Sequence, residues 1–107
     1  MKYYLMCKKV LGQKGFEKLV EDLTNQIIEK FSNSIILDKY MQILEYNIRL
    51  IMIISISNIL GLDEGEKNTR ILIKNEENFL LSNSLNEFEE KNKILINKIT
   101  NLLKWNM

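Results

Sequence analysis

The chain has 107 residues, a mass of 12.7 kDa and a net charge of +1, and 46% of its residues are hydrophobic. These values fit one folded domain that covers residues 1–107, and they argue against a disordered chain. Because the sequence has no His and only one Cys, it lacks the imidazole base of Ser-His-Asp and Cys-His enzymes and the usual ligands of a zinc site.

The acidic residues do not replace these missing catalytic groups. Their clusters are Asp63-Glu64 with Glu66, Glu76-Glu77 and Glu89-Glu90. Adjacent residues do not face each other on a helix, and the first cluster lacks the residue order of a calcium-binding loop. We therefore expect a protein that is not an enzyme and that holds no metal ion or cofactor.

The first predicted element is a helix that ends at Gly12. Its apolar residues recur at three- and four-residue steps, at Tyr3, Tyr4, Cys7, Val10 and Leu11. Glycine is the commonest residue just after a helix end. The lone Cys7 can form no disulfide within the chain, as is typical of a cytoplasmic protein, and the four apolar residues before it are too few for an export signal.

From residue 15 onward the sequence predicts an amphipathic helix that ends before Ser32. Its apolar side chains are Phe16, Leu19, Val20, Leu23, Ile27, Ile28 and Phe31. The tripeptide Ser32-Asn33-Ser34 breaks this pattern and offers an N-cap for the next helix.

Residues 35–60 predict one long helix, closed by Gly61, that forms the centre of the fold. Its second half is apolar on nearly every side, with Ile48, Leu50, Ile51, Met52, Ile53, Ile54, Ile56, Ile59 and Leu60. A helix without a polar face must be enclosed by other helices or by a partner chain. Its longest apolar run, residues 50–60, is shorter than the roughly 20 residues that a membrane-spanning helix needs, so we expect no membrane association.

The segment after Gly61 is the least regular part of the sequence. Residues 61–68 predict a loop, because they are polar and include two glycines. Residues 69–83 fit either a short β-hairpin near 70–82 or an irregular helix, since short apolar runs do not separate the two.

The last predicted element is one continuous helix that starts at Ser84. Ser84 and Glu87 match a capping box, in which each side chain bonds a free backbone N–H group. The apolar residues occupy heptad positions, with Asn92 in an otherwise vacant one: Leu85, Phe88, Leu95, Ile99 and Leu102. We expect this heptad stripe to pack within its own domain rather than in a two-chain coiled coil.

Positive charge is concentrated at the two ends of the chain. Residues 1–14 and residues 91–107 each carry four Lys and no acid, whereas residues 15–90 carry seven basic and fourteen acidic residues. If the two ends meet, their lysines and aromatic residues form one patch for a partner. The residues that we predict to contact a partner are Tyr3, Tyr4, Lys8, Lys9, Lys14, Lys98, Lys104 and Trp105. The alternative is an ordinary solvated surface.

The sequence therefore predicts a mainly α protein, a compact bundle of four to five helices around residues 35–60. The predicted function is a non-catalytic protein-binding module, a small cytoplasmic inhibitor that covers a larger protein or nucleoprotein, of the anti-defence, antitoxin or immunity type. The abundance of Ile, Asn and Lys, whose codons are rich in A and T, is typical of AT-rich genomes such as those of phages and mobile elements. Two alternatives remain open: a nucleic-acid-binding accessory protein that uses the terminal lysines, and a self-associating structural protein such as a homodimer.

Overall fold

The computed structural model describes residues 2–32, 35–61, 63 and 81–105, and these residues contain four helices and no strand. The helices are α1 (Lys2–Phe31), α2 (Leu37–Leu60), α4 (Leu85–Lys91) and α5 (Lys93–Trp105). The predicted mainly α class is confirmed. The two alternatives for residues 69–83 fall almost entirely outside the described residues, and the last residues of that segment, 81–83, form bends.

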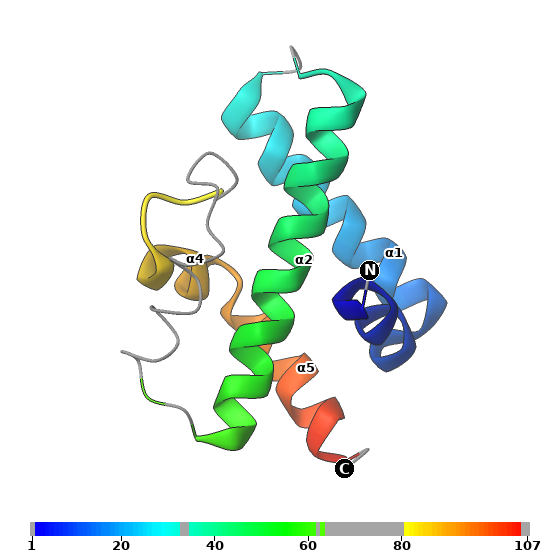
Figure 1. Ribbon diagram of the computed structural model, residues 1–107, viewed down its shortest axis with the longest axis vertical. Coiled ribbons are helices and arrows are strands. Elements are labelled where there is room, and N and C mark those ends of the chain that lie inside the picture. The colour runs from blue at the N-terminus through cyan, green and yellow to red at the C-terminus, as the bar shows by residue number, and fades with distance from the viewer. Residues whose placement is uncertain (1, 33–34, 62, 64–80, 106–107) are drawn as a thin grey trace.

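Helix α1 consists of two helical segments that meet at Gly12, as the sequence predicts. Gly12 has φ 74° and ψ 175°, a backbone conformation that residues with a Cβ rarely adopt. The short N-terminal segment therefore turns across the rest of α1 (Figure 1). Edge-to-face packing of Tyr4 on Phe16, with ring centroids 4.8 Å apart, joins the two segments, and Cys7 is buried between its neighbours in the core.

Helix α2 begins later than predicted and without the predicted cap. Its N-cap is Ile36, an extended residue that makes no side-chain cap hydrogen bond within the described part of the chain. Ser32 instead belongs to the end of α1, where it has a positive φ of 57° and its N–H donates to the Ile28 carbonyl. The prediction that Ser32-Asn33-Ser34 caps the second helix is therefore wrong, because the N-cap is Ile36, which comes after this tripeptide in the chain. The predicted end is confirmed: Gly61 is left-handed and its N–H donates to the Ser57 carbonyl.

Helix α2 is the buried central element of the fold. It passes through the middle of the molecule in Figure 1 and contacts both α1 and α5. Its length and its mean hydropathy of 1.5 would suffice to cross a membrane, but 67% of that apolar window is buried inside the molecule. This burial is typical of the core helix of a soluble protein.

The last predicted helix is not continuous, because it breaks at Asn92. The Asn92 side chain is buried, its Nδ2 donates to the Phe88 carbonyl, and its φ of −111° ends α4. After this break the buried face of α5 consists of Ile96, Ile99, Thr100 and Leu103. The predicted heptad stripe is therefore only partly correct in α5: Ile99 is completely buried, whereas Leu95 and Leu102 are half-buried. The Ser84 half of the predicted capping box is confirmed, since the Ser84 Oγ accepts a hydrogen bond from the Glu87 N–H at 3.1 Å.

Candidate protein-interaction surface

The outward side of α5 carries a row of four exposed residues, Ile94, Lys98, Asn101 and Trp105, here called the α5 stripe. Their spacing of four, three and four residues aligns them along one side of the helix over about 16 Å. Ile94 is 88% exposed and Trp105 is 87% exposed. Two of the largest apolar side chains of the chain therefore stand in water at the two ends of one helical face.

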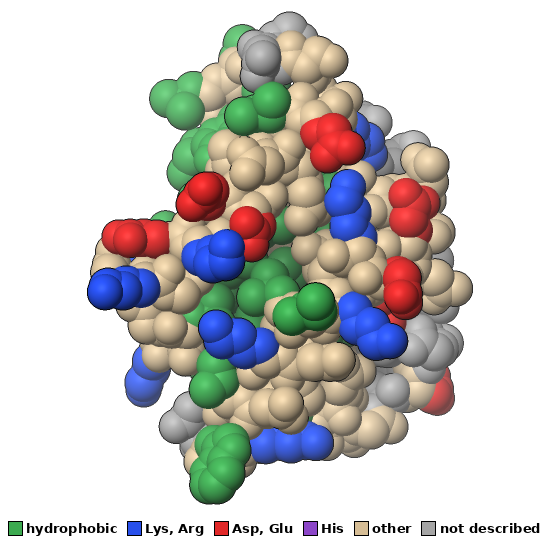
Figure 2. All heavy atoms as spheres, turned by 180° about the vertical axis from the view of Figure 1, so that it is seen from behind, with side chains coloured by type: hydrophobic (Ala, Val, Ile, Leu, Met, Phe, Trp, Pro, Cys, Tyr) green, Lys and Arg blue, Asp and Glu red, His purple; other side chains and the backbone are tan. Residues whose placement is uncertain are grey.

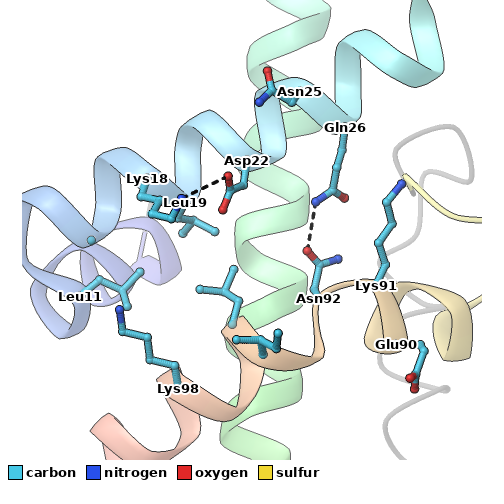
Figure 3. A pocket seen from close by; sticks show the side chains of 13 residues that line it. Leu11, Lys18, Leu19, Asp22, Asn25, Gln26, Glu90, Lys91, Asn92 and Lys98 are labelled. Atoms are coloured by element: carbon cyan, nitrogen blue, oxygen red, sulfur yellow. Dashed lines mark hydrogen bonds and ion pairs between the residues drawn. The ribbon is translucent and has the colours of Figure 1, made fainter.

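A groove lies beside the α5 stripe, between α1 and the last two helices. Its volume is about 570 Å³, and Leu11 and Leu19 from α1 face Ile94 and Leu95 across it. Lys98 extends toward Leu11 across the opening (Figure 3). Figure 2 shows this face of the molecule, where hydrophobic side chains gather near the middle and both Lys and acidic side chains lie around them. The charged residues that line the groove are Lys18, Lys91 and Lys98 with Asp22 and Glu90, so an apolar floor is combined with an edge of slight positive excess.

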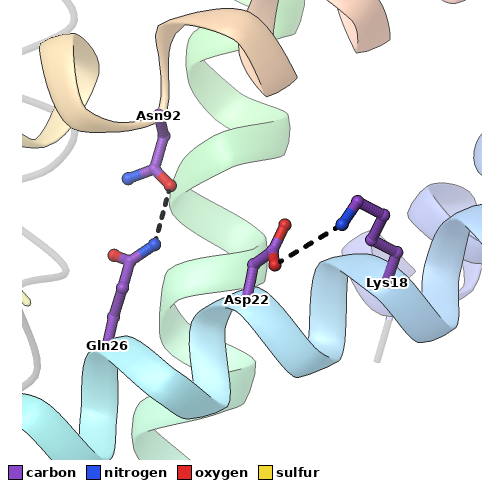
Figure 4. Close-up of polar contacts among 4 residues, drawn as sticks. All are labelled: Lys18, Asp22, Gln26 and Asn92. Atoms are coloured by element: carbon purple, nitrogen blue, oxygen red, sulfur yellow. Dashed lines mark hydrogen bonds and ion pairs between the residues drawn. The ribbon is translucent and has the colours of Figure 1, made fainter.

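Two amides fix the wall of this groove. The Gln26 Nε2 donates a hydrogen bond to the Asn92 Oδ1 at 3.1 Å, which joins α1 to the α4–α5 junction (Figure 4). The Gln26 Oε1 is buried and has no hydrogen-bond partner among the described residues. Because the junction sets the rotation of α5, this amide pair also determines which α5 residues face outward.

Ion pairing in and around the groove is weak. Lys18 and Asp22 form an exposed pair at 4.0 Å within α1, a geometry that contributes little in water. Lys91 and Lys98 have no carboxylate within salt-bridge distance in the described part of the chain.

The structure distributes the predicted contact residues over two regions. Lys98, Lys104 and Trp105 are exposed on α5. Among the predicted α1 residues, Lys8, Lys9 and Lys14 are exposed, and Tyr3 and Tyr4 are half-buried against the core. Tyr4 and Lys8 line a smaller hollow of about 210 Å³ next to Phe16. In Figure 1 the marked N- and C-terminal ends lie well apart, and it is the middle of α1 that meets α5 at the groove.

Sequence reasoning missed two exposed apolar features. Ile94 lies outside the predicted heptad positions. Its spacing, four residues before Lys98 and eleven before Trp105, could have predicted that it shares one helical face with them. The second feature is the corner between α1 and α2, where Ile36 and Leu37 are exposed beside a hollow of about 360 Å³. Three consecutive apolar residues directly after a polar turn, 35–37, were the signal for that corner.

The described residues contain no group of three or more His, Cys, Asp or Glu side chains placed to bind a metal ion. Burial raises the pKa of the Cys7 thiol from 9.0 to about 12. A thiol with so high a pKa is a poor nucleophile, because the thiolate is the reactive form. Cys7 is therefore a small apolar residue of the core.

Comparison with protein-family models, curated proteins and solved structures gives no match for this chain. Function is therefore inferred from the chemistry of its own surface.

Proposed function

We propose that this chain is a non-catalytic protein-binding module, a small cytoplasmic regulator that inhibits a larger protein by covering part of its surface. The α5 stripe is the contact face. The observation that carries this proposal is the exposure of Ile94 and Trp105 on one side of a helix whose other side is fully packed. Large exposed apolar side chains mark interaction sites, and Trp is enriched among the residues that dominate binding energy.

The charge of the chain supports a protein partner over a nucleic acid. The net charge is only +1, and neither Arg is in α5. Nucleic-acid-binding domains usually carry a stronger basic excess, and Arg is the commonest reader of base edges. The lysines of α1 and α5 still favour nucleic acid as the second candidate, and a steep loss of DNA or RNA binding between low and moderate salt would identify it.

The abundance of Ile, Asn and Lys, whose codons are rich in A and T, supports an origin in a phage or another mobile element. Small regulators from such sources commonly act by occluding a host or competing protein, as anti-defence, antitoxin and immunity proteins do. This expectation defines the material for the experiment, which is a lysate of the organism that encodes the chain.

The test compares two exposed apolar residues, one inside and one outside the α5 stripe. The tagged chain captures its partner from the lysate, the partner is identified and purified, and its affinity is measured by calorimetry. We expect Trp105→Ala to weaken binding at least tenfold and to leave the thermal midpoint of the chain nearly unchanged. The control Leu5→Ala removes another exposed apolar side chain, on α1, and should change affinity less than twofold. Equal effects of the two variants, or a loss of stability that matches the loss of binding, would contradict the proposal.

A further inference from the structure

We infer that the partner contributes an acidic amphipathic helix, which lies along the α5 stripe and inserts an apolar side chain into the groove between α1 and α5. This inference rests on the proposed function and specifies the chemistry of the partner. It follows from the charge of α5, from the spacing of the stripe and from the poor fit of a second copy of the chain.

The charge of α5 calls for acidic groups on the partner. Helix α5 contains three Lys, at positions 93, 98 and 104, and no Asp or Glu. Lys98 lies inside the stripe, between its two apolar ends, and it also lines the groove. A partner that covers Ile94 and Trp105 must remove water from Lys98, and an unpaired Lys in a dry interface is costly. A carboxylate opposite Lys98 removes this cost.

The spacing of the stripe calls for a helix. Ile94 and Trp105 lie eleven residues apart, about 16 Å along α5, which is about three helical turns. A second helix laid alongside presents side chains with the same three- and four-residue steps and can meet both ends of the stripe. The groove beside Ile94 and Leu95 then receives an apolar side chain from the partner helix.

A second copy of the chain fits the apolar ends but not the charge. Two antiparallel copies of α5 would place Ile94 opposite the Trp105 of the other copy, and Lys98 opposite Asn101. The same pairing would bring the Lys98 of each copy within about one helical turn of the other, with no acid on either α5. Like charges in a shared interface disfavour it by several kcal/mol. The stripe therefore selects a partner of opposite charge.

The test uses defined peptides and the full chain. The first peptide is a fluorescein-labelled 15-residue helix with Leu at three- and four-residue steps and Glu between them. The second replaces every Glu with Lys, the third replaces every Leu with Ser, and the fourth ligand is a labelled 15-base-pair DNA duplex. We expect the first peptide to bind with at least tenfold higher affinity than each of the others, measured by fluorescence anisotropy. In a heteronuclear NMR titration, its binding should shift the backbone amides of Gly15, Leu95 and Lys98.

Two charge reversals on the same helix supply the matched control. Lys98 lines the groove, whereas Lys93 lies at a different hollow, next to Ile54 and Glu89. We expect Lys98→Glu to weaken binding of the Leu-Glu peptide at least tenfold and Lys93→Glu to weaken it less than threefold, with both variants folded by circular dichroism.

Three results would overturn the inference: no binding of the Leu-Glu peptide at millimolar concentration, binding of the Ser-Glu peptide or DNA as tight as that of the Leu-Glu peptide, or equal effects of the two Lys variants. One of these results could occur while Trp105→Ala still weakens binding of the purified native partner more than Leu5→Ala does. In that case the proposed function stands, and only the inference of an acidic helix is wrong.

Discussion

Helices α2 and α5 use their apolar residues in opposite ways. In α2 the apolar side chains of the central turns are enclosed, with Ile51, Met52 and Ile54 almost completely buried, and only those near its two ends are exposed. In α5 one side is buried through Ile96, Ile99 and Leu103, while Ile94 and Trp105 remain in water. The hydrophobic free energy of α2 is therefore realised when the chain folds, whereas that of the α5 stripe is realised only when a partner covers it.

The polar residues of the two helices show how the fold allows this difference. Helix α2 buries Asn47 and Ser55, which donate to the carbonyls of Ile43 and Ile51, one turn earlier in the same helix. These local bonds satisfy the Asn47 Nδ2 and the Ser55 Oγ within α2 and so reduce the cost of burying them. Helix α5 divides its polar residues between its two sides: Thr100 is buried and its Oγ1 donates to the Ile96 carbonyl, whereas Lys98 and Asn101 are exposed.

Truncation of one isoleucine in each helix gives the largest expected contrast. Ile51→Ala removes a side chain that is completely buried, and it should lower the free energy of unfolding by roughly 2–5 kcal/mol, because a cavity remains in the centre of the fold. Ile94→Ala should change it by less than about 0.5 kcal/mol, as is typical of surface positions. Urea denaturation followed by circular dichroism measures both. A loss of more than about 1 kcal/mol for Ile94→Ala would contradict the assignment of Ile94 to a free surface.

Thiol reactivity tests the same contrast without removing core atoms. Cys7 is buried with a pKa of about 12, three units above its ordinary value of 9.0. At pH 8 its thiolate fraction, and with it the labelling rate, is therefore lower by about a thousandfold than for a free thiol. An Ile94→Cys variant adds an exposed thiol on the stripe. We expect one fast and one very slow phase with a disulfide reagent, and two fast phases would contradict the burial of Cys7.

The raised pKa also fixes the direction of a pH dependence. Because the thiol ionises at higher pH in the folded state than in the unfolded state, unfolding releases a proton between pH 9 and about 12. The stability that Cys7 contributes is complete below pH 9 and falls as the pH rises toward 12. Cys7→Ala should show a shallower decline over this range in denaturation measured at several pH values.

The hydrogen bond between Gln26 and Asn92 lies at the α4–α5 junction, from which α5 starts, and therefore bears on which α5 residues are buried and which are exposed. Asn92→Ala should lower the free energy of unfolding by about 1–3 kcal/mol, since it also deprives the Gln26 amide of its partner. A double-mutant cycle with Gln26→Ala isolates the pair, and we expect a coupling of roughly 0.5–1.5 kcal/mol. A coupling near zero would mean that the break at Asn92 is fixed by other contacts.

Local chemistry in the sequence was sufficient to predict most helix ends. Gly12, Gly61 and Ser84 lie where the structure breaks, closes or caps a helix, because positive φ angles and cap hydrogen bonds depend on a few adjacent residues. The buried centre of α2 followed from its apolar circumference. The break at Asn92 was missed because a heptad pattern continues through it, and only the contact with Gln26, 66 residues away, identifies it.

The candidate surface was predictable only in part for the same reason. Trp105 and Lys98 were predicted as contact residues, and both are exposed. Ile94 was not, since its exposure depends on the rotation of α5 after Asn92. The half-burial of Tyr3 and Tyr4 depends on the turn at Gly12, which folds the first segment of α1 onto Phe16. The spacing of residues along one helix does not predict such contacts between separate helical segments.

The smallest expected effect concerns the N-terminal caps of the helices. Here the buried central helix α2 is the one that lacks a favourable side-chain contact among the described residues, and the short helix α4 has one. Helix α4 begins with a Ser84 cap, whereas α2 begins at the exposed, extended residue Ile36, without a side-chain cap in the described part of the structure. Ser84→Ala should lower the free energy of unfolding by about 1 kcal/mol, and Ile36→Ser should raise it by about 0.5–1 kcal/mol by supplying an oxygen for a free N–H group. Leu37→Ser, one residue into α2, should give no gain. A thermal midpoint that rises for Ile36→Ser alone would show that burial holds α2 together even though its first turn lacks a cap. An unchanged midpoint would mean that water already bonds the free N–H groups of this first turn.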